Sequence, residues 1–367
     1  MKISVTKDDL ANGLQIVQNV VGARSTLPIL SNVLLVAGEN KLEMRATDLE
    51  VSVHASVPAK VEREGATSIP AKRLFGLIRE IEGGEVEIEV NDKEIATVQA
   101  GAAKYKLHGI GADEYPQQAK FKESGKIKVS QAKFREMLRK TAYAVSTDES
   151  RHVLNGIHIV MEPERLTLVA TDGRRLALVE EEVEGGTKAE IIVPNKAVGE
   201  LQRLLQGEGE IEIGIGETHA EFTLPQEGGE AVKLHSKLVE GNYPNYKQVI
   251  PAESQQRITL AKEELHHALR RADQITNDKQ NSVKLKFTKN NLSITANTPE
   301  IGSGRESIAI KYSGPEIEVA FNPTYLMDPL KVLEGDEIYL EITDSLSPGV
   351  IKSNTPFLYV IMPMRTN

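Results

Sequence analysis

The sequence contains no cysteine, and this absence excludes several kinds of site. Without thiols the chain forms no disulfide, no thiolate metal centre and no cysteine nucleophile, and it fits a reducing compartment. No apolar run approaches the ~20 residues that cross a bilayer, and the amino terminus lacks a signal-peptide pattern. We therefore expect a globular protein of the cytoplasm.

Positive charge is scarce too, since 44 Lys and Arg stand against 53 Asp and Glu, a formal net charge of −9. This balance argues against binding nucleic acid over the whole surface, although it permits a local basic patch. Aromatic residues make up 4% of the chain, which leaves few side chains for base stacking. The sequence also lacks a phosphate-binding loop, a dinucleotide-binding motif, a nucleophile elbow and metal-ligand histidine spacing. We expect no cofactor, no metal ion and no catalytic residue.

The chain does contain a pattern that occurs three times. Its copies open with "KISVTKDDLANGLQIV" at 2, "KIKVSQAKFREMLRKT" at 126 and "RITLAKEELHHALRRA" at 257. Each segment begins with strand-like alternation and continues with helical spacing, and two strands, a second helix and further strands follow in each copy. The pattern predicts an α+β fold of three tandem similar domains, 1–125, 126–254 and 255–367, each with two helices packed on antiparallel sheet.

Basic residues recur at equivalent helix positions in these copies. On the second helix they are Arg79, Arg203 and Lys331, with Lys72 and Lys196 seven residues earlier. On the first helix of copies two and three they are Arg139, Lys140, Arg270 and Arg271. A single helix of this kind is usually only a solvated face, but recurrence in three diverged copies favours a surface that contacts phosphates without reading sequence.

A different question concerns Asp172 in "LVATDGRRLALV" at 168, which resembles a reactive acid beside two arginines. Its equivalents are Asp48 in copy one and Thr298 in copy three, so the acid is not confined to one copy. We predict that Asp172 shapes a turn by accepting backbone N–H groups. The alternative is a metal-dependent nuclease that uses Asp48 and Asp172.

Over its whole length the chain resembles the bacterial DNA polymerase III beta subunits, the sliding clamps. The resemblance is carried by "TLPILSNVLL" at 26, "VLNGIHI" at 153, "LVATDGRRLALV" at 168, "SKLVEGNYPNY" at 236, "YSGPEIEVAFN" at 312 and "VIMPMR" at 360. It implies a head-to-tail homodimer, a ring of six domains whose helices surround duplex DNA. It also implies a non-catalytic processivity role with DNA polymerase III alpha subunit, clamp loader, other polymerases and repair proteins as partners. A scaffold that binds partners without forming a ring is the rival interpretation.

The resemblance also implies residues for each role. DNA contacts fall on Arg24, Lys72 and His152. The dimer interface falls on Arg73, Lys104, Tyr105, Gln274, Ile275 and Glu300. A pocket for partner peptides falls on Leu154, Thr171, Gly173, Arg174, Arg175, Leu176, Pro244, Val249, Asn322, Tyr325, Leu346, Val360, Met362, Pro363 and Met364. Leu and Met side chains suit an adaptable apolar groove that accepts several ligands.

Overall fold

A computed structural model describes residues 1–22, 27–118, 121–226, 230–252, 254–277 and 281–365. The α-helices of this part are α1 (Lys7–Val17), α2 (Ala71–Glu80), α3 (Gln131–Thr141), α4 (Asn195–Leu204), α5 (Lys262–Asp273) and α6 (Pro323–Val332). Short 3₁₀ segments are η1 (Pro28–Ser31), η2 (Ala112–Glu114), η3 (Ala142–Ala144), η4 (Glu149–Leu154) and η5 (Tyr246–Val249). The repeated order of strand, helix, strands, helix and strands is confirmed. None of the described helices is long and apolar enough to cross a membrane.

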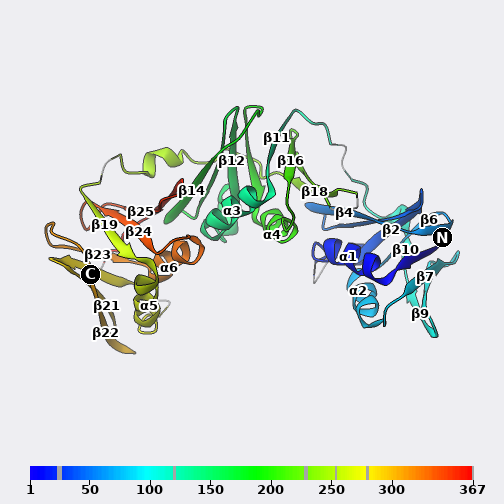
Figure 1. Ribbon diagram of the computed structural model, residues 1–367, viewed down its shortest axis with the longest axis horizontal. Coiled ribbons are helices and arrows are strands. Elements are labelled where there is room, and N and C mark those ends of the chain that lie inside the picture. Colours follow the sequence, from blue (N-terminus) through cyan, green and yellow to red (C-terminus); the bar gives the residue numbers. More distant parts are fainter. Residues whose placement is uncertain (23–26, 119–120, 227–229, 253, 278–280, 366–367) are drawn as a thin grey trace. The chain divides into compact units, whose positions relative to one another are not determined.

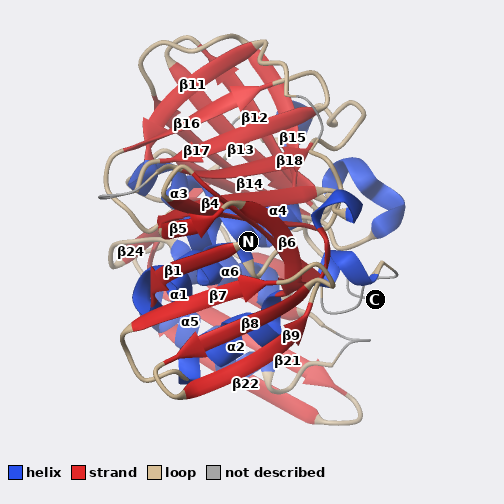
Figure 2. Cartoon of the chain, turned by 90° about the vertical axis from the view of Figure 1, so that its right-hand side faces the viewer, coloured by secondary structure: helices blue, strands red, loops and turns tan. Residues whose placement is uncertain are grey.

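The chain divides into two compact units, of which the first comprises Met1–Arg135, Val183–Ala189 and Lys196–Leu238. Its smaller sheet, seen in front in Figure 2, has the order β5 (Lys60–Arg63), β1 (Lys2–Thr6), β7 (Glu85–Val90), β8 (Ile95–Ala100), β9 (Ala103–His108). Its larger sheet has the order β10 (Ile110–Gly111), β6 (Gly65–Pro70), β2 (Asn32–Gly38), β3 (Lys41–Thr47), β4 (Val51–Pro58), β18 (Val232–Lys237), β17 (His219–Leu224), β16 (Glu210–Ile215), β11 (Gly125–Ser130).

The second unit comprises Glu136–Glu182, Glu190–Asn195 and Val239–Asn367. Its larger sheet has the order β15 (Ala189–Pro194), β12 (Gly156–Glu162), β13 (Arg165–Thr171), β14 (Arg175–Glu182), β26 (Phe357–Ile361), β25 (Gly349–Lys352), β24 (Glu337–Ile342), β19 (Gln256–Ala261). The other has the order β22 (Gly302–Ala309), β21 (Asn291–Thr298), β20 (Val283–Thr288), β23 (Ile317–Phe321). Helices α5 and α6 pack side by side in this unit (Figure 1).

One strand pair in each unit joins strands from different repeats, and we call these two pairs the seams. In the first unit β4 pairs antiparallel with β18, and in the second β14 pairs antiparallel with β26. The registers are equivalent: Ser52 lies opposite His235 in the first seam, and Leu176 lies opposite Val360 in the second. Each seam therefore makes one continuous sheet from two repeats. The predicted boundaries at 125 and 254 stay predictions, because the two units follow these shared sheets.

The repeated helices bury the apolar positions that their spacing predicts. Leu10 and Leu14 of α1 are fully buried, as are Phe134 and Leu138 of α3 and Leu269 of α5. Burying such side chains stabilises the fold by roughly 1.5–3 kcal/mol each. Polar and charged residues occupy the opposite faces of these helices. Packing of the apolar face on the core therefore determines the direction in which the basic side chains point.

Candidate functional site: an apolar pocket and basic helices

The turn after β13 is built by Thr171 and Asp172, as the sequence predicts. Asp172 Oδ1 accepts hydrogen bonds from the backbone N–H groups of Arg174 (2.8 Å) and Arg175 (3.0 Å). Asp48 makes the same turn after β3, where its Oδ1 accepts from the N–H groups of Glu50 and Val51. The structural role of Asp172 is therefore confirmed. Gly173 in this turn has φ +85°, a left-handed conformation that suits glycine.

Arg175 is the most highly connected side chain near the turn. Its guanidinium donates to Asp172 Oδ2 (3.1 Å), to Asp328 Oδ2 (2.5 Å) and to the Tyr143 carbonyl (2.5 Å). It also lies 4.3 Å from the centroid of the Tyr325 ring. Burial alone lowers the pKa of Arg175, but Tyr359 and Asp328 outweigh it and raise that pKa above its ordinary value. A network of charged hydrogen bonds thus stabilises the turn, and Arg175 is the residue that connects its members.

Beside this network lies a cavity of about 140 Å³ in the second unit. It is lined by Leu154, Thr171, Gly173, Arg174, Arg175, Leu176, Pro244, Asn245, Tyr246, Val249, Val360 and Met362. Val169, Leu176 and Val360 form a buried apolar cluster here, and Tyr243 packs on it. The structure therefore brings most of the predicted pocket residues around one apolar space. Sequence reasoning missed Asn245 and Tyr246, although they directly follow Pro244.

Five predicted pocket residues lie outside the lining of this cavity: Asn322, Tyr325, Leu346, Pro363 and Met364. Asn322 caps α6, because its Oδ1 accepts from the N–H groups of Thr324 and Tyr325. The Tyr325 ring lies under Arg175. Leu346 and Met364 are exposed at 76% and 39%, and Val249 and Met362, which do line the cavity, at 46% and 41%. Two of these exposed large apolar side chains, Val249 and Met362, thus lie at the cavity, a pattern typical of a binding surface.

A second cavity, of about 420 Å³, lies in the first unit at the repeat-equivalent place. Thr47, Ser52, Pro116 and His235 line it where Thr171, Leu176, Pro244 and Val360 line the other. Polar residues thus replace the apolar cluster. The His54 and His235 rings lie 5.2 Å apart here, and burial, with smaller effects of His235 and Arg45, lowers the pKa of His54 to about 3.

The basic helix residues differ widely in how available they are. Lys72, Arg79 and Arg270 are exposed and form no ion pair with another described residue. Arg139 and Lys331 are partly exposed and pair with Glu136 and Asp328, each at 2.8 Å. His152 is exposed in η4, whereas Arg24 lies outside the described residues.

Three of the predicted DNA contacts already have partners within the chain. Lys140 is buried and pairs with Glu136 at 3.1 Å, so it cannot belong to an exposed basic surface. Lys196 forms an ion pair with Asp48. Arg203 donates to the carbonyls of Gln15 (3.1 Å) and Ile16 (2.5 Å) in α1. Burial contradicts the prediction for Lys140. The DNA contacts predicted for Lys196 and Arg203 stay predictions, although both side chains have partners in a distant segment of the chain.

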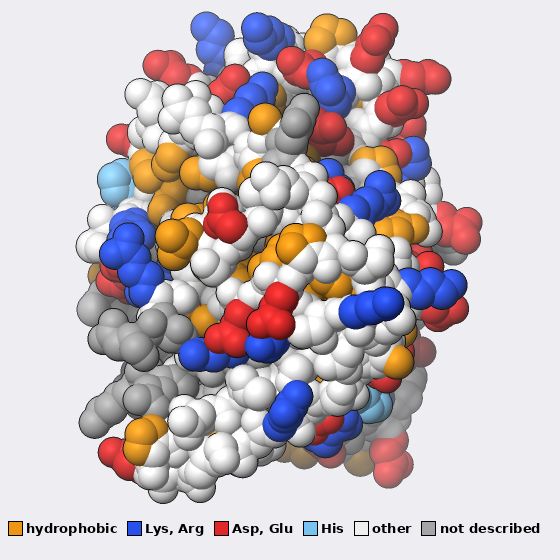
Figure 3. Space-filling view, turned by 90° about the vertical axis from the view of Figure 1, so that its left-hand side faces the viewer, with side chains coloured by type: hydrophobic (Ala, Val, Ile, Leu, Met, Phe, Trp, Pro, Cys, Tyr) orange, Lys and Arg blue, Asp and Glu red, His pale blue; other side chains and the backbone are white. Residues whose placement is uncertain are grey.

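The predicted interface residues lie at two edges. Lys104 and Tyr105 are on β9, the last strand of its sheet, and Arg73 is exposed on α2. Gln274 and Ile275 follow α5, and Glu300 lies in the turn between β21 and β22. Strand β22 is an edge strand of its sheet. Tyr105 is 49% exposed, and Ile301 beside Glu300 is 50% exposed. On the face of the molecule drawn in Figure 3, basic and acidic side chains are mixed and apolar patches lie between them.

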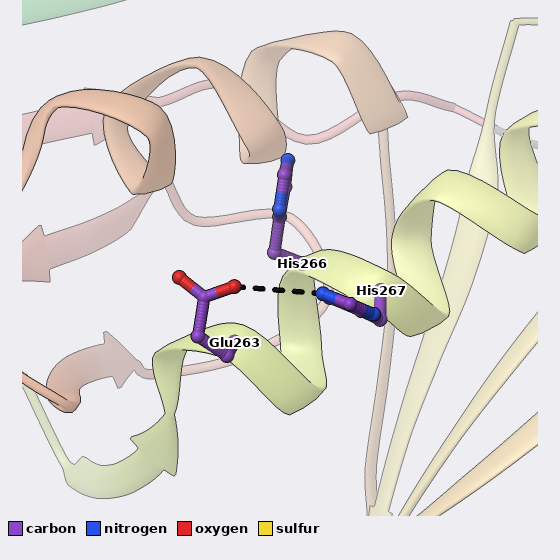
Figure 4. Close-up of side chains that lie close together, drawn as sticks. All are labelled: Glu263, His266 and His267. Carbon is purple, nitrogen blue, oxygen red and sulfur yellow. Dashed lines mark ion pairs between the residues drawn. The ribbon is translucent and has the colours of Figure 1, made fainter.

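One group of possible metal ligands occurs in the described chain, on a single turn of α5. Ligand atoms of Glu263, His266 and His267 all lie within 4.8 Å of one another (Figure 4). His267 Nε2 and Glu263 Oε2 already pair at 3.5 Å. Burial lowers the pKa of His266, Glu263 opposes this shift, and the nearby cations Arg270 and Lys331 add to it. Positive neighbours oppose a bound cation, so we assign no metal to these residues.

Comparison with known proteins settles what kind of protein carries these features. Family models of the N-terminal, central and C-terminal domains of the DNA polymerase III beta subunit match residues 1–119, 128–245 and 247–365, in that order. The chain belongs to this family. The beta sliding clamp of Chlamydia muridarum (strain MoPn / Nigg) is 34% identical over 100% of this chain and 99% of its own length. That of Proteus mirabilis is 33% identical over 100% of both.

Solved sliding clamps have the same fold as this beta-subunit chain. The DnaN sliding clamp of Bartonella birtlesii, solved bound to griselimycin, is 33% identical with a TM-score of 0.94. The DNA polymerase III beta subunit of Pseudomonas aeruginosa is 30% identical with a TM-score of 0.95, and both comparisons cover 100% of each chain. The fold of three similar α+β domains is confirmed. The family is the processivity subunit and is not itself catalytic, so the nuclease alternative is wrong.

Proposed function

We propose that two copies of this chain close head to tail into a six-domain ring around duplex DNA and tether the replicative polymerase. The observation that supports it most is the pair of seams. Strands β18 and β26 occupy the same place in their repeats as β9, and β4 and β14 occupy the same place as β22. Both β9 and β22 are edge strands. A third seam between β9 of one copy and β22 of the other repeats the pattern, and two such seams close a dimer.

The seams also give a register for this third pairing. Lys233 lies opposite His54 in the first seam, and Leu358 lies opposite Leu178 in the second. Following the hairpin registers, the equivalents are Lys104 of one copy and Arg305 of the other. Tyr105 then lies opposite Gly304, whose added Cβ would be 3.3 Å from Ile275 Cγ1. In this register the exposed Tyr105 side chain would pack over Gly304 and Ile275 of the other copy.

Cysteine pairs test this register, since the chain has no cysteine of its own. Lys104→Cys with Arg305→Cys is expected to give a covalent dimer under mild oxidation, because opposed Cα atoms in antiparallel strands are within disulfide reach. Tyr105→Cys with Arg305→Cys is the control, since a one-residue slip puts the two thiols on opposite faces of the sheet. Equal cross-linking of both variants would contradict the register.

Retention on DNA tests the ring itself. After loading, the dimer is expected to stay on nicked circular DNA and to leave the same DNA once it is linearised, because topology rather than affinity holds it. Oxidising the Lys104→Cys, Arg305→Cys dimer after loading closes the ring covalently. This dimer is expected to show a larger difference in retention between circular and linear DNA. Equally fast loss from circular and linear DNA would favour a scaffold that does not form a ring.

The DNA-facing surface of the proposed ring consists of exposed basic residues on helices. Lys72 and Arg270 support it best, since both are exposed and form no ion pair with another described residue. Arg139, Lys331 and His152 add partly or fully exposed groups. Such residues attract phosphates without reading bases, which permits sliding. The acidic remainder of the chain keeps other surfaces off the duplex.

The cavity of the second unit is the proposed docking pocket for peptides of the polymerase alpha subunit, the clamp loader and repair proteins. Griselimycin, bound by the B. birtlesii relative, is a convenient probe. Met362→Ala removes an exposed side chain from the lining and is expected to weaken griselimycin binding roughly tenfold. Met364→Ala is the matched control, because Met364 is similarly exposed but does not line the cavity. Unchanged affinity for Met362→Ala, measured by calorimetry, would exclude this pocket.

A further inference from the structure

Arg203 connects two repeats within the first unit by hydrogen bonds from its side chain to the end of a helix. It lies in the last turn of α4, and its two terminal nitrogens donate to the Gln15 and Ile16 carbonyls at 3.1 and 2.5 Å. These carbonyls belong to the last turn of α1, which carries no basic residue of its own. Carbonyls at a helix C-terminus lack intrahelical donors and carry partial negative charge. The guanidinium therefore satisfies and neutralises the end of a helix from the neighbouring repeat.

Arg79 is the repeat equivalent of Arg203, but its side chain donates to no helix end among the described residues. It lies in the last turn of α2 and is exposed, and its guanidinium carbon lies 5.8 Å from the centroid of the Phe75 ring. Its side chain forms no hydrogen bond or ion pair with another described residue. The equivalents of Gln15 and Ile16 in the third repeat are Arg270 and Arg271 of α5. At that helix end the Arg270 carbonyl accepts from Gln274 Nε2 at 3.5 Å, and the Arg271 carbonyl accepts from the Gln274 backbone N–H at 3.2 Å. A carbonyl oxygen has two lone pairs, so each can accept a further donor.

We infer that Arg79 of one copy donates its two terminal nitrogens to the Arg270 and Arg271 carbonyls of a second copy, and so secures the dimer. This assignment rests on the proposed ring, because only that closure brings α2 of one copy to α5 of the other. Arg79 then belongs to the subunit interface and not to the DNA-facing surface. The side chain of Arg271 is already neutralised by two hydrogen bonds to Glu306, at 2.8 and 2.7 Å, which limits repulsion.

The third member of the equivalent set shows why arginine matters. Lys331 in α6 holds this position in the second unit, and it pairs with Asp328 on its own helix at 2.8 Å. It makes no hydrogen bond to the α3 carbonyls of the described chain. A lysine presents a single charged nitrogen, whereas the arginine fork reaches two acceptors at once. Arg79 retains the residue type that performs the contact in the first unit.

Sedimentation equilibrium of the full chain tests the assignment. Arg79→Ala and Arg79→Lys are both expected to raise the dimer dissociation constant roughly tenfold or more, because each removes the two-pronged donation. Lys93→Ala, an exposed lysine in the β7–β8 turn, is the matched control. Thermal unfolding of each variant at a concentration where all are monomeric checks that the subunit itself is intact.

The outcomes separate this assignment from the proposed ring. A monomeric wild-type chain overturns the ring and the assignment together. A dimeric wild type with unchanged dissociation constants for both Arg79 variants overturns only the assignment. Weakening by Arg79→Ala alone, with Arg79→Lys like wild type, shows that charge suffices and also overturns it. Weakening by both variants but not by Lys93→Ala supports it.

Discussion

Arg175 links three separate segments of the second unit through its single side chain. Its guanidinium is about 10% exposed and sits between the Asp172 and Asp328 carboxylates, which are 15% and 14% exposed. It also holds the Tyr143 carbonyl of η3. Removal of the cation leaves two largely buried carboxylates without a counter-charge, which costs much more than the loss of one surface ion pair.

Arg175→Ala is therefore expected to lower the free energy of unfolding by roughly 3 kcal/mol or more. Arg174→Ala, one residue away in the same turn and exposed, is the matched control and is expected to change it by less than about 0.5 kcal/mol. Urea unfolding monitored by circular dichroism measures both. Similar stabilities for the two variants would show that the charged network contributes little.

His54 makes stability depend on pH in the acid range. Its pKa is about 3 in the folded chain against an ordinary 6.5, because of burial and the nearby His235, Arg45 and Lys233, while Glu43 acts in the opposite direction. The unfolded chain therefore binds the proton more tightly, and the free energy of unfolding falls as pH drops below 6.5. His54→Gln is expected to remove about 3 kcal/mol of the wild-type loss between pH 7 and pH 4. Urea titrations across that range, with the exposed His108→Gln as control, measure the difference.

Single residues also show what the sequence could and could not predict. The role of Asp172 was predictable, since its partners are two and three residues away and Asp48 repeats the arrangement. The engagement of Arg203 was not, because its acceptors are 188 and 187 residues away. Helical spacing places a side chain on a face but does not say what lies opposite. The same applies to Asn322, whose capping role separates it from the predicted pocket.

At the scale of elements, α6 begins with a side-chain cap that α2 lacks. Asn322 supplies the acceptor for Thr324 N–H at 2.9 Å, whereas Pro70 before α2 makes no such side-chain bond. Asn322→Ala is expected to lower the free energy of unfolding by about 1 kcal/mol, and Asn322→Asp to retain most of it. Denaturant unfolding compares them. If Asn322→Ala instead weakens griselimycin binding with unchanged stability, Asn322 acts in the pocket as first predicted.

Helices and hairpins were predictable because each is a local pattern of 10 to 20 residues with apolar periods of 3.6 or 2. The seams could not be predicted, because the pairing of β4 with β18 joins residues far apart in the sequence, such as Ser52 and His235. No periodic sequence pattern indicates such a long-range pairing. The alternation of apolar and polar residues predicts that a segment is a strand, but it does not predict which other edge strand that strand will pair with. The seams also explain why the two compact units do not coincide with the repeats.

At the scale of the whole molecule, the proposed DNA contact is electrostatic. Replacing Lys72 and Arg270 by alanine is expected to reduce the slope of log affinity against log salt by roughly 1 for each phosphate contact removed. Lys93→Ala with Lys289→Ala, both exposed in turns, is the charge-matched control. Fluorescence anisotropy on a short duplex at several salt concentrations measures the slope. An equal effect of both double variants would mean that net charge, and not the helix face, governs binding.

The shared register of the seams has a mechanical consequence. In antiparallel pairing the hydrogen bonds run across the strands, so a force along a seam loads all of them together. A force applied at one end loads them one after another, as in opening a zipper. Each seam therefore resists sliding far better than peeling. A ring closed by a third seam of this kind would open with least work by peeling β9 from its tip.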